Sequence, residues 1–140
     1  MSQHVEGRLK ASIPDAFRGE PVLFAYLYGS HARGDTHPRS DVDVAVYLDP
    51  SVPATAHLGQ ALAIAGQVER SAGIGPVEVL VLNSAPLPVV GRVIEERVVI
   101  YSRDEPARVE FESVRHRQFL DFEIHARPLA EALLRRVARS

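Results

Sequence analysis

Hydrophobic residues gather in four short runs along the chain, and each run predicts a strand. The runs cover residues 22–28 (VLFAYLY), 42–48 (VDVAVYL), 77–82 (VEVLVL) and 97–101 (RVVIY). Short apolar runs bounded by turn residues are typical of strands that are covered on both faces of a sheet. The pattern therefore predicts a four-stranded sheet that is packed by helices.

Apolar residues at three-to-four spacing predict helices between and after these strands. Residues 54–71 carry the clearest helical periodicity, and residues 89–96 form a shorter helix. A long final helix begins after Asp104, whose side chain is a good N-terminal cap. The order of elements indicates a small α/β (α+β) fold of one domain over residues 1–140. Its core covers about residues 20–103, and a helical extension covers residues 104–138.

Two prolines are expected to interrupt helices, because proline lacks the backbone N–H and its ring crowds the preceding turn. Residues 5–18 resemble a weak helix that Pro14 should break or end. Pro128 should kink or split the long final helix before it continues to its end.

Composition excludes several classes of protein. The formal net charge is −2, which gives no overall attraction to nucleic acid, and the absence of cysteine excludes disulfides and thiolate metal sites. No segment approaches the about 20 apolar residues of a membrane span, and the N-terminus has no apolar signal core. We therefore expect a cytoplasmic protein without membrane or direct nucleic-acid binding.

Asp41 and Asp43 open the second apolar run at a spacing of two residues. Side chains alternate faces along a strand, so both carboxylates should lie on the same face, with Ala45 and Tyr47. Such a pair supplies the hard oxygen ligands that suit Mg²⁺. The alternative is a pair of solvated carboxylates at a strand edge.

Gly29 and Ser30 end the first apolar run, ten residues before the aspartate pair. Glycine lets the backbone approach an anion closely, and backbone N–H groups and a serine hydroxyl can donate hydrogen bonds to phosphate oxygens. Arg33, in the segment that follows, could also contact phosphates. Each feature alone is also consistent with an ordinary surface turn.

Glu78 is an acid inside the third apolar run. A buried carboxylate costs free energy unless it is paired or bound to a metal. If the third strand lies beside the second, Glu78 could join the aspartates as a metal ligand or as a general base. The alternative is a glutamate on an edge strand that reaches water.

The stretch LYGSHARGDTHPRSDVDVAVYL resembles the G-S-x10-D-x-D signature of the DNA polymerase β-like nucleotidyltransferases, and above all the minimal nucleotidyltransferases (MNT). The resemblance extends over roughly residues 22–104 and implies their small mixed sheet. It also implies that Mg²⁺ binds to the aspartate pair and that ATP is the substrate, while a third acid, which corresponds to Glu78, is more often aspartate. The residues that we assign to metal and catalysis are Asp41, Asp43 and Glu78, and those that we assign to nucleotide binding are Gly29, Ser30, Arg33 and Ser40.

Proteins of this size in that family resemble the antitoxins of HEPN–MNT toxin–antitoxin pairs. The resemblance implies transfer of AMP from ATP to a tyrosine hydroxyl of a HEPN ribonuclease toxin. The HEPN motif R-x4-H does not occur in this chain, so the chain would be the antitoxin. The alternatives are nucleotidyl transfer to a small molecule such as an aminoglycoside, and a non-catalytic antitoxin that acts by binding alone.

An apolar stripe on the C-terminal extension could dock such a partner. Its members recur at helical spacing, and an amphipathic helix can bind in a hydrophobic groove. The first half of the stripe could instead pack on the protein's own sheet. The stripe consists of Phe119, Phe122, Ala126, Leu129, Leu133 and Val137.

Overall fold

Four strands form one mixed sheet in the computed structural model, which describes residues 2–34 and 41–139. Their order across the sheet is β3-β2-β1-β4; β1 runs antiparallel to β2 and to β4, and β3 runs parallel to β2. The predicted sheet is therefore confirmed, with β3 and β4 at its edges. The strands are β1 (Val22–Tyr28), β2 (Val42–Leu48), β3 (Val77–Val81) and β4 (Val98–Ser102).

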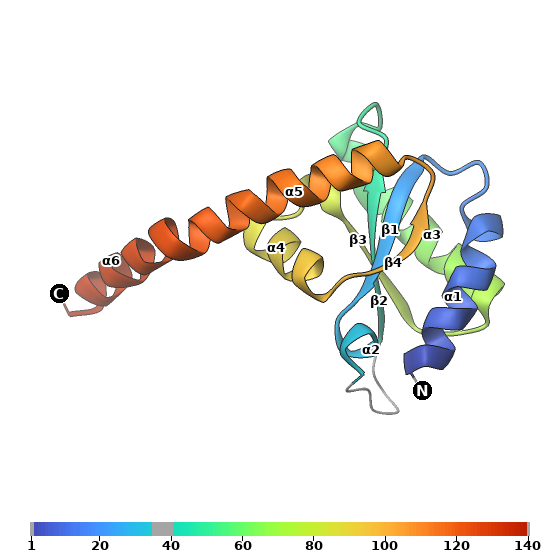
Figure 1. Cartoon of the computed structure of the whole chain (residues 1–140), viewed down its shortest axis with the longest axis horizontal. Helices are drawn as coiled ribbons and strands as arrows, with labels where there is room; N and C mark the ends of the chain where they lie inside the picture. The colour runs from blue at the N-terminus through green and yellow to red at the C-terminus, as the bar shows by residue number, and fades with distance from the viewer. Residues whose placement is uncertain (1, 35–40, 140) are drawn as a thin grey trace.

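Helices cover both faces of the sheet, with α1 and α3 on one side and α4 and α5 on the other (Figure 1). The alternation along β2 shows why the faces differ. Val44 and Val46 belong to the core under α1 and α3, whereas Ala45 and Tyr47 pack in the core under α4 and α5. The helices are α1 (Ser2–Ala16), α2 (Ser30–Arg33), α3 (His57–Ala72), α4 (Leu87–Glu96), α5 (Glu105–Asp121) and α6 (Arg127–Arg139).

The two prolines have different effects. Of the prediction that Pro14 breaks or ends the first helix, the break is wrong, because α1 includes Pro14 and ends two residues later at Ala16. Pro14 lacks the N–H that would donate to the preceding turn, and buried residues on either side of it, Ile13 and Ala16, hold the last turn on the core despite this loss. Before Pro128 the helix widens into a π-helical segment, Phe122–Ala126, which accommodates the proline without ending the helical path.

The helix α5 crosses the sheet and continues through the π-helical segment into α6, which projects away from the body (Figure 1). Asp104 caps α5 as predicted, since its carboxylate accepts a hydrogen bond from the N–H of Ala107. Phe119 is buried against α4, where a Cβ on Gly91 would lie 2.1 Å from its ring. The first part of the predicted stripe therefore packs on α4, while α6 contains no buried residue.

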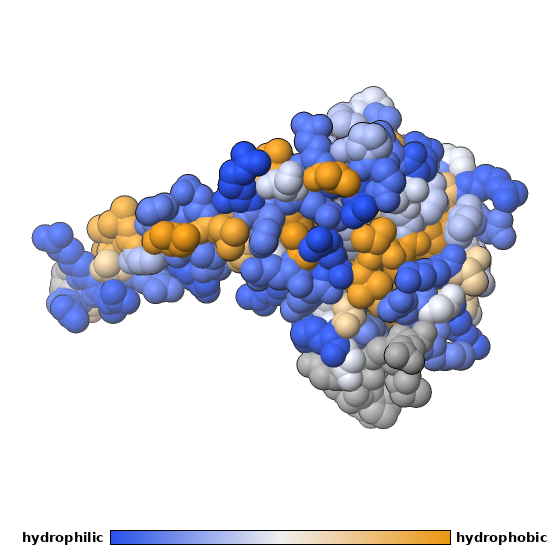
Figure 2. Space-filling view, in the orientation of Figure 1, coloured by the Kyte–Doolittle hydropathy of each residue, from blue (hydrophilic) through white to orange (hydrophobic). Residues whose placement is uncertain are grey.

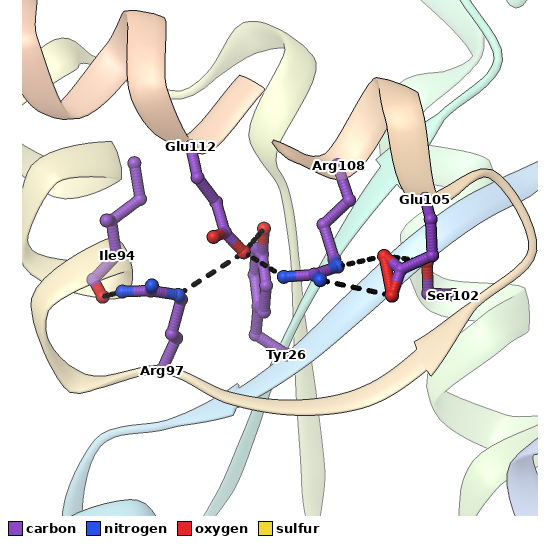
Figure 3. A network of polar contacts seen from close by, with 7 residues as sticks. All are labelled: Tyr26, Ile94, Arg97, Ser102, Glu105, Arg108 and Glu112. Atoms are coloured by element: carbon purple, nitrogen blue, oxygen red, sulfur yellow. Dashed lines mark hydrogen bonds and ion pairs between the residues drawn. The ribbon is translucent and has the colours of Figure 1, made fainter. Parts of the chain in front are cut away.

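A network of polar side chains fixes the start of α5 to the sheet (Figure 3). The hydroxyl of Tyr26 on β1 donates a hydrogen bond of 2.8 Å to Glu112 on α5. The same carboxylate forms ion pairs with Arg108 at 2.7 Å and with Arg97 at 3.2 Å. Burial, followed by the hydrogen bond to Glu112, raises the pKa of Tyr26. The network thus satisfies a buried hydroxyl and orients the base of the projecting helix.

None of the described helices is long and apolar enough to cross a membrane.

Candidate functional site

The predicted carboxylates meet at one end of the sheet. Asp43 lies opposite Glu78 in the parallel β2–β3 register and opposite Tyr28 in the antiparallel β1–β2 register. Asp41 immediately precedes β2, two residues from Asp43. The third strand thus lies beside the second, which brings Glu78 next to the aspartates. Two acids from the start of β2 and a third from β3, distant in the sequence, therefore lie together at one corner of the sheet.

The three acids differ in their exposure to solvent. Asp43 is half-buried, whereas Asp41 and Glu78 are exposed. Of the two alternatives for Glu78, the structure has the glutamate on an edge strand, because β3 lies at the edge of the sheet and the Glu78 side chain is exposed to water. Glu78 thus lies next to the aspartates without being enclosed by them.

Burial and like charges together destabilise the ionised form of Asp43. Burial is the main cause that raises its pKa, and the neighbouring charges of Glu78 and Asp41 raise it further. His31 and Arg33 act in the opposite direction. A cation at this position would relieve the repulsion, so the donor set fits a hard divalent ion.

The hydroxyl of Tyr28, on the neighbouring strand β1, lies in the same negative potential. Burial, with contributions from Asp43, Glu78 and Glu96, raises the pKa of the Tyr28 hydroxyl to about 12. Three carboxylates acting on one hydroxyl show that negative charge is concentrated here.

These residues could hold a hard divalent cation such as Mg²⁺. Asp41, just before β2, and Asp43, on β2, offer oxygen ligands, and Glu78 on β3 adds a third. As the side chains lie, no three acidic or histidine side chains within the described ranges enclose a metal position. Binding would require Glu78 or the aspartates to rotate toward a common point.

Gly29 closes the site from the end of β1, and only glycine can occupy this position. Its φ of 77° and ψ of −153° lie in a region that side-chain-bearing residues avoid. A Cβ at this position would lie 2.3 Å from Oδ2 of Asp43. The missing side chain brings the Gly29 backbone against the carboxylate of Asp43. The approach of this backbone to a phosphate stays a prediction.

Glu96 is a site residue that the sequence analysis missed. From the end of α4, its carboxylate accepts hydrogen bonds from the N–H of Gly29 at 3.1 Å and from the guanidinium of Arg33 at 2.9 Å. No motif marks Glu96, because its relation to the glycine depends on how α4 packs against β1. It holds two groups that we assigned to the nucleotide.

The other predicted nucleotide contacts lie on or beside α2. Ser30 is the first residue of this one-turn helix and is partly buried, and Arg33 is its last residue. The Arg33 side chain is 46% exposed even while it is paired with Glu96. Ser40 lies outside the described residues.

Comparison with known proteins gives the family of the chain. The family model described as polymerase beta, nucleotidyltransferase matches residues 12–106, which is more than half of the chain. A search of curated proteins found no match.

Solved structures share the fold over nearly the whole length. A chain of a toxin–antitoxin crystal structure with AMP-PNP is 18% identical, with a TM-score of 0.63 over 92% of this chain and 98% of the other. A chain of a MntA–HepT toxin–antitoxin structure is 16% identical, with a TM-score of 0.60 over 93% and 97%.

A third match includes the projecting helix. It is a chain from a tri-AMPylated Shewanella oneidensis HEPN toxin in complex with an MNT antitoxin, 17% identical, with a TM-score of 0.59 over 99% of both chains. At this identity the likeness concerns the fold. The family match, together with the sheet and the corner of carboxylates beside Gly29, shows that the chain belongs to the polymerase β-type nucleotidyltransferases.

Proposed function

We propose that this protein is the antitoxin of a HEPN–MNT pair and transfers AMP from ATP to a tyrosine hydroxyl of its HEPN toxin. The observation that carries the proposal is the juxtaposition of Gly29, Asp43 and Glu78 at one end of the sheet. It supplies a close backbone approach for phosphate beside acids for a metal. Structures of similar fold are described as toxin–antitoxin complexes, one with AMP-PNP and one with a tri-AMPylated HEPN toxin.

In this proposal Asp41 and Asp43 hold Mg²⁺, with Glu78 as a further ligand. The metal would neutralise the triphosphate charge when bound. On the other side of the aspartates, the Gly29–Ser30 step contacts the phosphates. Arg33 and Ser40 complete the assigned nucleotide contacts.

The transfer forms one bond and breaks another. The acceptor oxygen attacks the α-phosphorus of ATP, the bond from that phosphorus to the α,β-bridging oxygen breaks, and pyrophosphate leaves with the electron pair. The hydroxyl proton passes to Glu78 or to water beside it. Glu78 suits this role because it is exposed on the edge strand, where an acceptor from another molecule can reach it.

The HEPN partner would dock on the projecting helix. Apolar side chains follow α6 along one face, and Figure 2 shows them as an orange band on the projecting part of the molecule. We call this projecting helix, residues 127–139, the arm. Leu129, Leu133 and Val137 are 62%, 53% and 72% exposed. An apolar face that leaves the body of the protein is typical of a helix that a partner covers.

The test is transfer of labelled AMP to the cognate HEPN protein, to be sought in the gene next to the one that encodes this chain. With Mg²⁺ and α-labelled ATP we expect label on the HEPN protein with the wild type, and none with Asp41→Ala/Asp43→Ala. Undiminished labelling by the double variant, or no labelling by the wild type, would contradict the proposal. Mass spectrometry of the labelled protein identifies the acceptor residue.

Neutralisation by binding alone is the second candidate, and the exposed apolar face of α6 favours it. The Asp41→Ala/Asp43→Ala variant separates the two, because it keeps the arm intact. Survival of cells that express the HEPN toxin with this variant would indicate occlusion. Toxicity despite a normal level of the complex would indicate that transfer is required.

A further inference from the structure

The open edge of β3 lies next to the carboxylates and has an unused set of backbone hydrogen-bonding groups. The N–H of Val42 donates to the carbonyl of Pro76 at 2.9 Å, so the carbonyl of Pro76 points toward β2. Because successive residues of a strand alternate, the N–H and C=O groups of Val77, Val79 and Val81 point away from the sheet. One of these groups is already paired, since the N–H of Val77 donates to Glu69 at 2.8 Å. The bond from Val42 to Pro76 and the bond from Val77 to Glu69 agree that the backbone groups of Val77 face away from β2.

Beyond Val77 the edge is open. Among the described residues, Val79 has no hydrogen bond outside its ladder with β2. Its outward N–H and C=O are followed by the outward N–H of Val81. Donors and acceptors therefore follow one another along the edge at the spacing that pairing with a further strand requires. A row of this kind is a template for an extended peptide.

Exposed apolar side chains of α3 flank this edge. Leu58 and Leu62, one turn apart, are 73% and 68% exposed. They line a cavity of about 420 Å³ whose other walls include Val79, Glu78 and Asp41. A second cavity, of about 410 Å³, shares Leu58 and Val79 and continues along β3. The two form one groove that ends at the carboxylates.

We propose that this groove binds an extended segment of the acceptor protein as an additional strand beside β3. The proposal rests on the proposed function, because it names how the acceptor reaches Glu78. The outward groups of Val79 would pair with the backbone of the segment, and apolar side chains of the segment would pack on Leu58 and Leu62. The acidic end of the groove favours a segment with neutral or basic residues around its hydroxyl.

A peptide fits this groove better than the base of ATP. The five residues of β3 extend over roughly 13 Å at about 3.3 Å per residue. A base would use one donor and one acceptor and leave the rest of the edge unpaired. Continuous alternation of donors and acceptors matches a polypeptide backbone.

The first test is Val79→Pro, which removes the outward N–H. Proline is tolerated on an edge strand where its missing N–H faces solvent, so the ladder with β2 should remain. We expect a roughly tenfold higher KM for the HEPN protein, which corresponds to the loss of about one hydrogen bond. The KM for ATP should be unchanged. Circular dichroism checks the fold.

The second test leaves the strand intact and changes the helix. Leu58→Gln/Leu62→Gln should raise the KM for the HEPN protein in the same way, whereas Ala63→Gln, exposed on another side of α3, should not. If wild-type transfer proceeds and both groove variants match it, the groove proposal is wrong and the proposed function stands. A rise in the KM for ATP alone would assign the groove to the nucleotide and also overturn the proposal.

A binding measurement decides the matter even if no transfer occurs. Overlapping synthetic peptides that cover the tyrosines of the HEPN protein are titrated into the ¹⁵N-labelled chain. Binding in the groove predicts shifts of the amide signals of Val79 and Val81, and larger effects for peptides with basic than with acidic residues next to the tyrosine. Shifts confined to α6, or no binding by any peptide, would contradict it.

Discussion

At the scale of single residues, the site depends on an absent side chain. Gly29 adopts a φ of 77° and leaves the space that Oδ2 of Asp43 occupies. Gly29→Ala should therefore be strained by the backbone, at a cost of about 1–3 kcal/mol, and should also displace Asp43. We expect a lower unfolding midpoint in urea and loss of AMP transfer.

Gly19→Ala is the matched control for this substitution. Gly19 has a similar φ of 79°, but a Cβ at this position would meet no other atom. Its variant should show a backbone penalty of about 1–2 kcal/mol and keep full transfer activity. Equal activity of the two variants would show that contact with Asp43 does not matter.

Replacement of Asp43 by asparagine should have opposite effects on the stability of the metal-free protein and on metal binding. Burial and the charges of Glu78 and Asp41 disfavour its ionised form. Asp43→Asn removes this repulsion, so the metal-free variant should melt at a higher temperature than the wild type. Mg²⁺ should then stabilise the wild type and leave the variant unchanged, because a ligand stabilises only a fold that binds it. Differential scanning fluorimetry with and without Mg²⁺ measures both effects; equal stabilisation of the two proteins would exclude Asp43 as a ligand.

At the scale of elements, one buried hydroxyl connects the sheet to the base of the arm. Tyr26 donates to Glu112, which also pairs with Arg108 and Arg97 (Figure 3). Tyr26→Phe removes a hydrogen bond to a charged group and should lower the free energy of unfolding by about 1.5–3 kcal/mol. Tyr101→Phe is the control, because within the described residues its hydroxyl has no hydrogen bond. Equal urea curves for the two variants would contradict the role of the network.

The contact between α4 and α5 gives a second prediction at this scale. A Cβ on Gly91 would lie 2.1 Å from the ring of Phe119, so Gly91→Ala overfills the contact. We expect a loss of about 1–3 kcal/mol in unfolding free energy, although alanine favours a helix over glycine. Phe119→Leu in the same chain should recover part of this loss. A double-mutant cycle without coupling would show that the two residues do not compete for the same space.

The sequence predicted those parts of the fold that depend on local pattern. The strands β1 and β2 have the predicted bounds because their apolar runs end at Gly29 and at Asp49, where polar and turn residues begin. The position of Asp43 followed from alternation along a strand. The relation of Glu96 to Gly29 could not be predicted, because it arises from the packing of α4. The sequence left both the burial and the exposure of Glu78 open, since strand order decides which strand lies at an edge.

At the scale of the whole molecule, the proposed binding surfaces lie on two separate parts, the compact body and the projecting helix α6 (Figure 1). The body carries the carboxylates and the groove along β3, whereas the arm carries an apolar face that contacts neither. A partner that covers the arm would therefore be held without blocking the site. This arrangement suits a protein acceptor, which needs a stable docking surface and a separate, transient contact at the reacting atoms.

The arm gives the final prediction, which concerns assembly. Leu129 and Leu133 are 62% and 53% exposed, so Leu129→Lys/Leu133→Lys should leave the melting temperature of the isolated chain unchanged. If the HEPN protein covers them, each leucine contributes roughly 1.5–3 kcal/mol by burial, and affinity should fall by roughly a hundredfold or more. Arg135→Glu is the control, because at about 100° per residue Arg135 lies on the opposite face of α6 from these leucines. Light scattering after size-exclusion chromatography should show the complex with the control and separate proteins with the double variant. A complex that persists with the double variant would place the partner elsewhere, and transfer of AMP would then depend on the body alone.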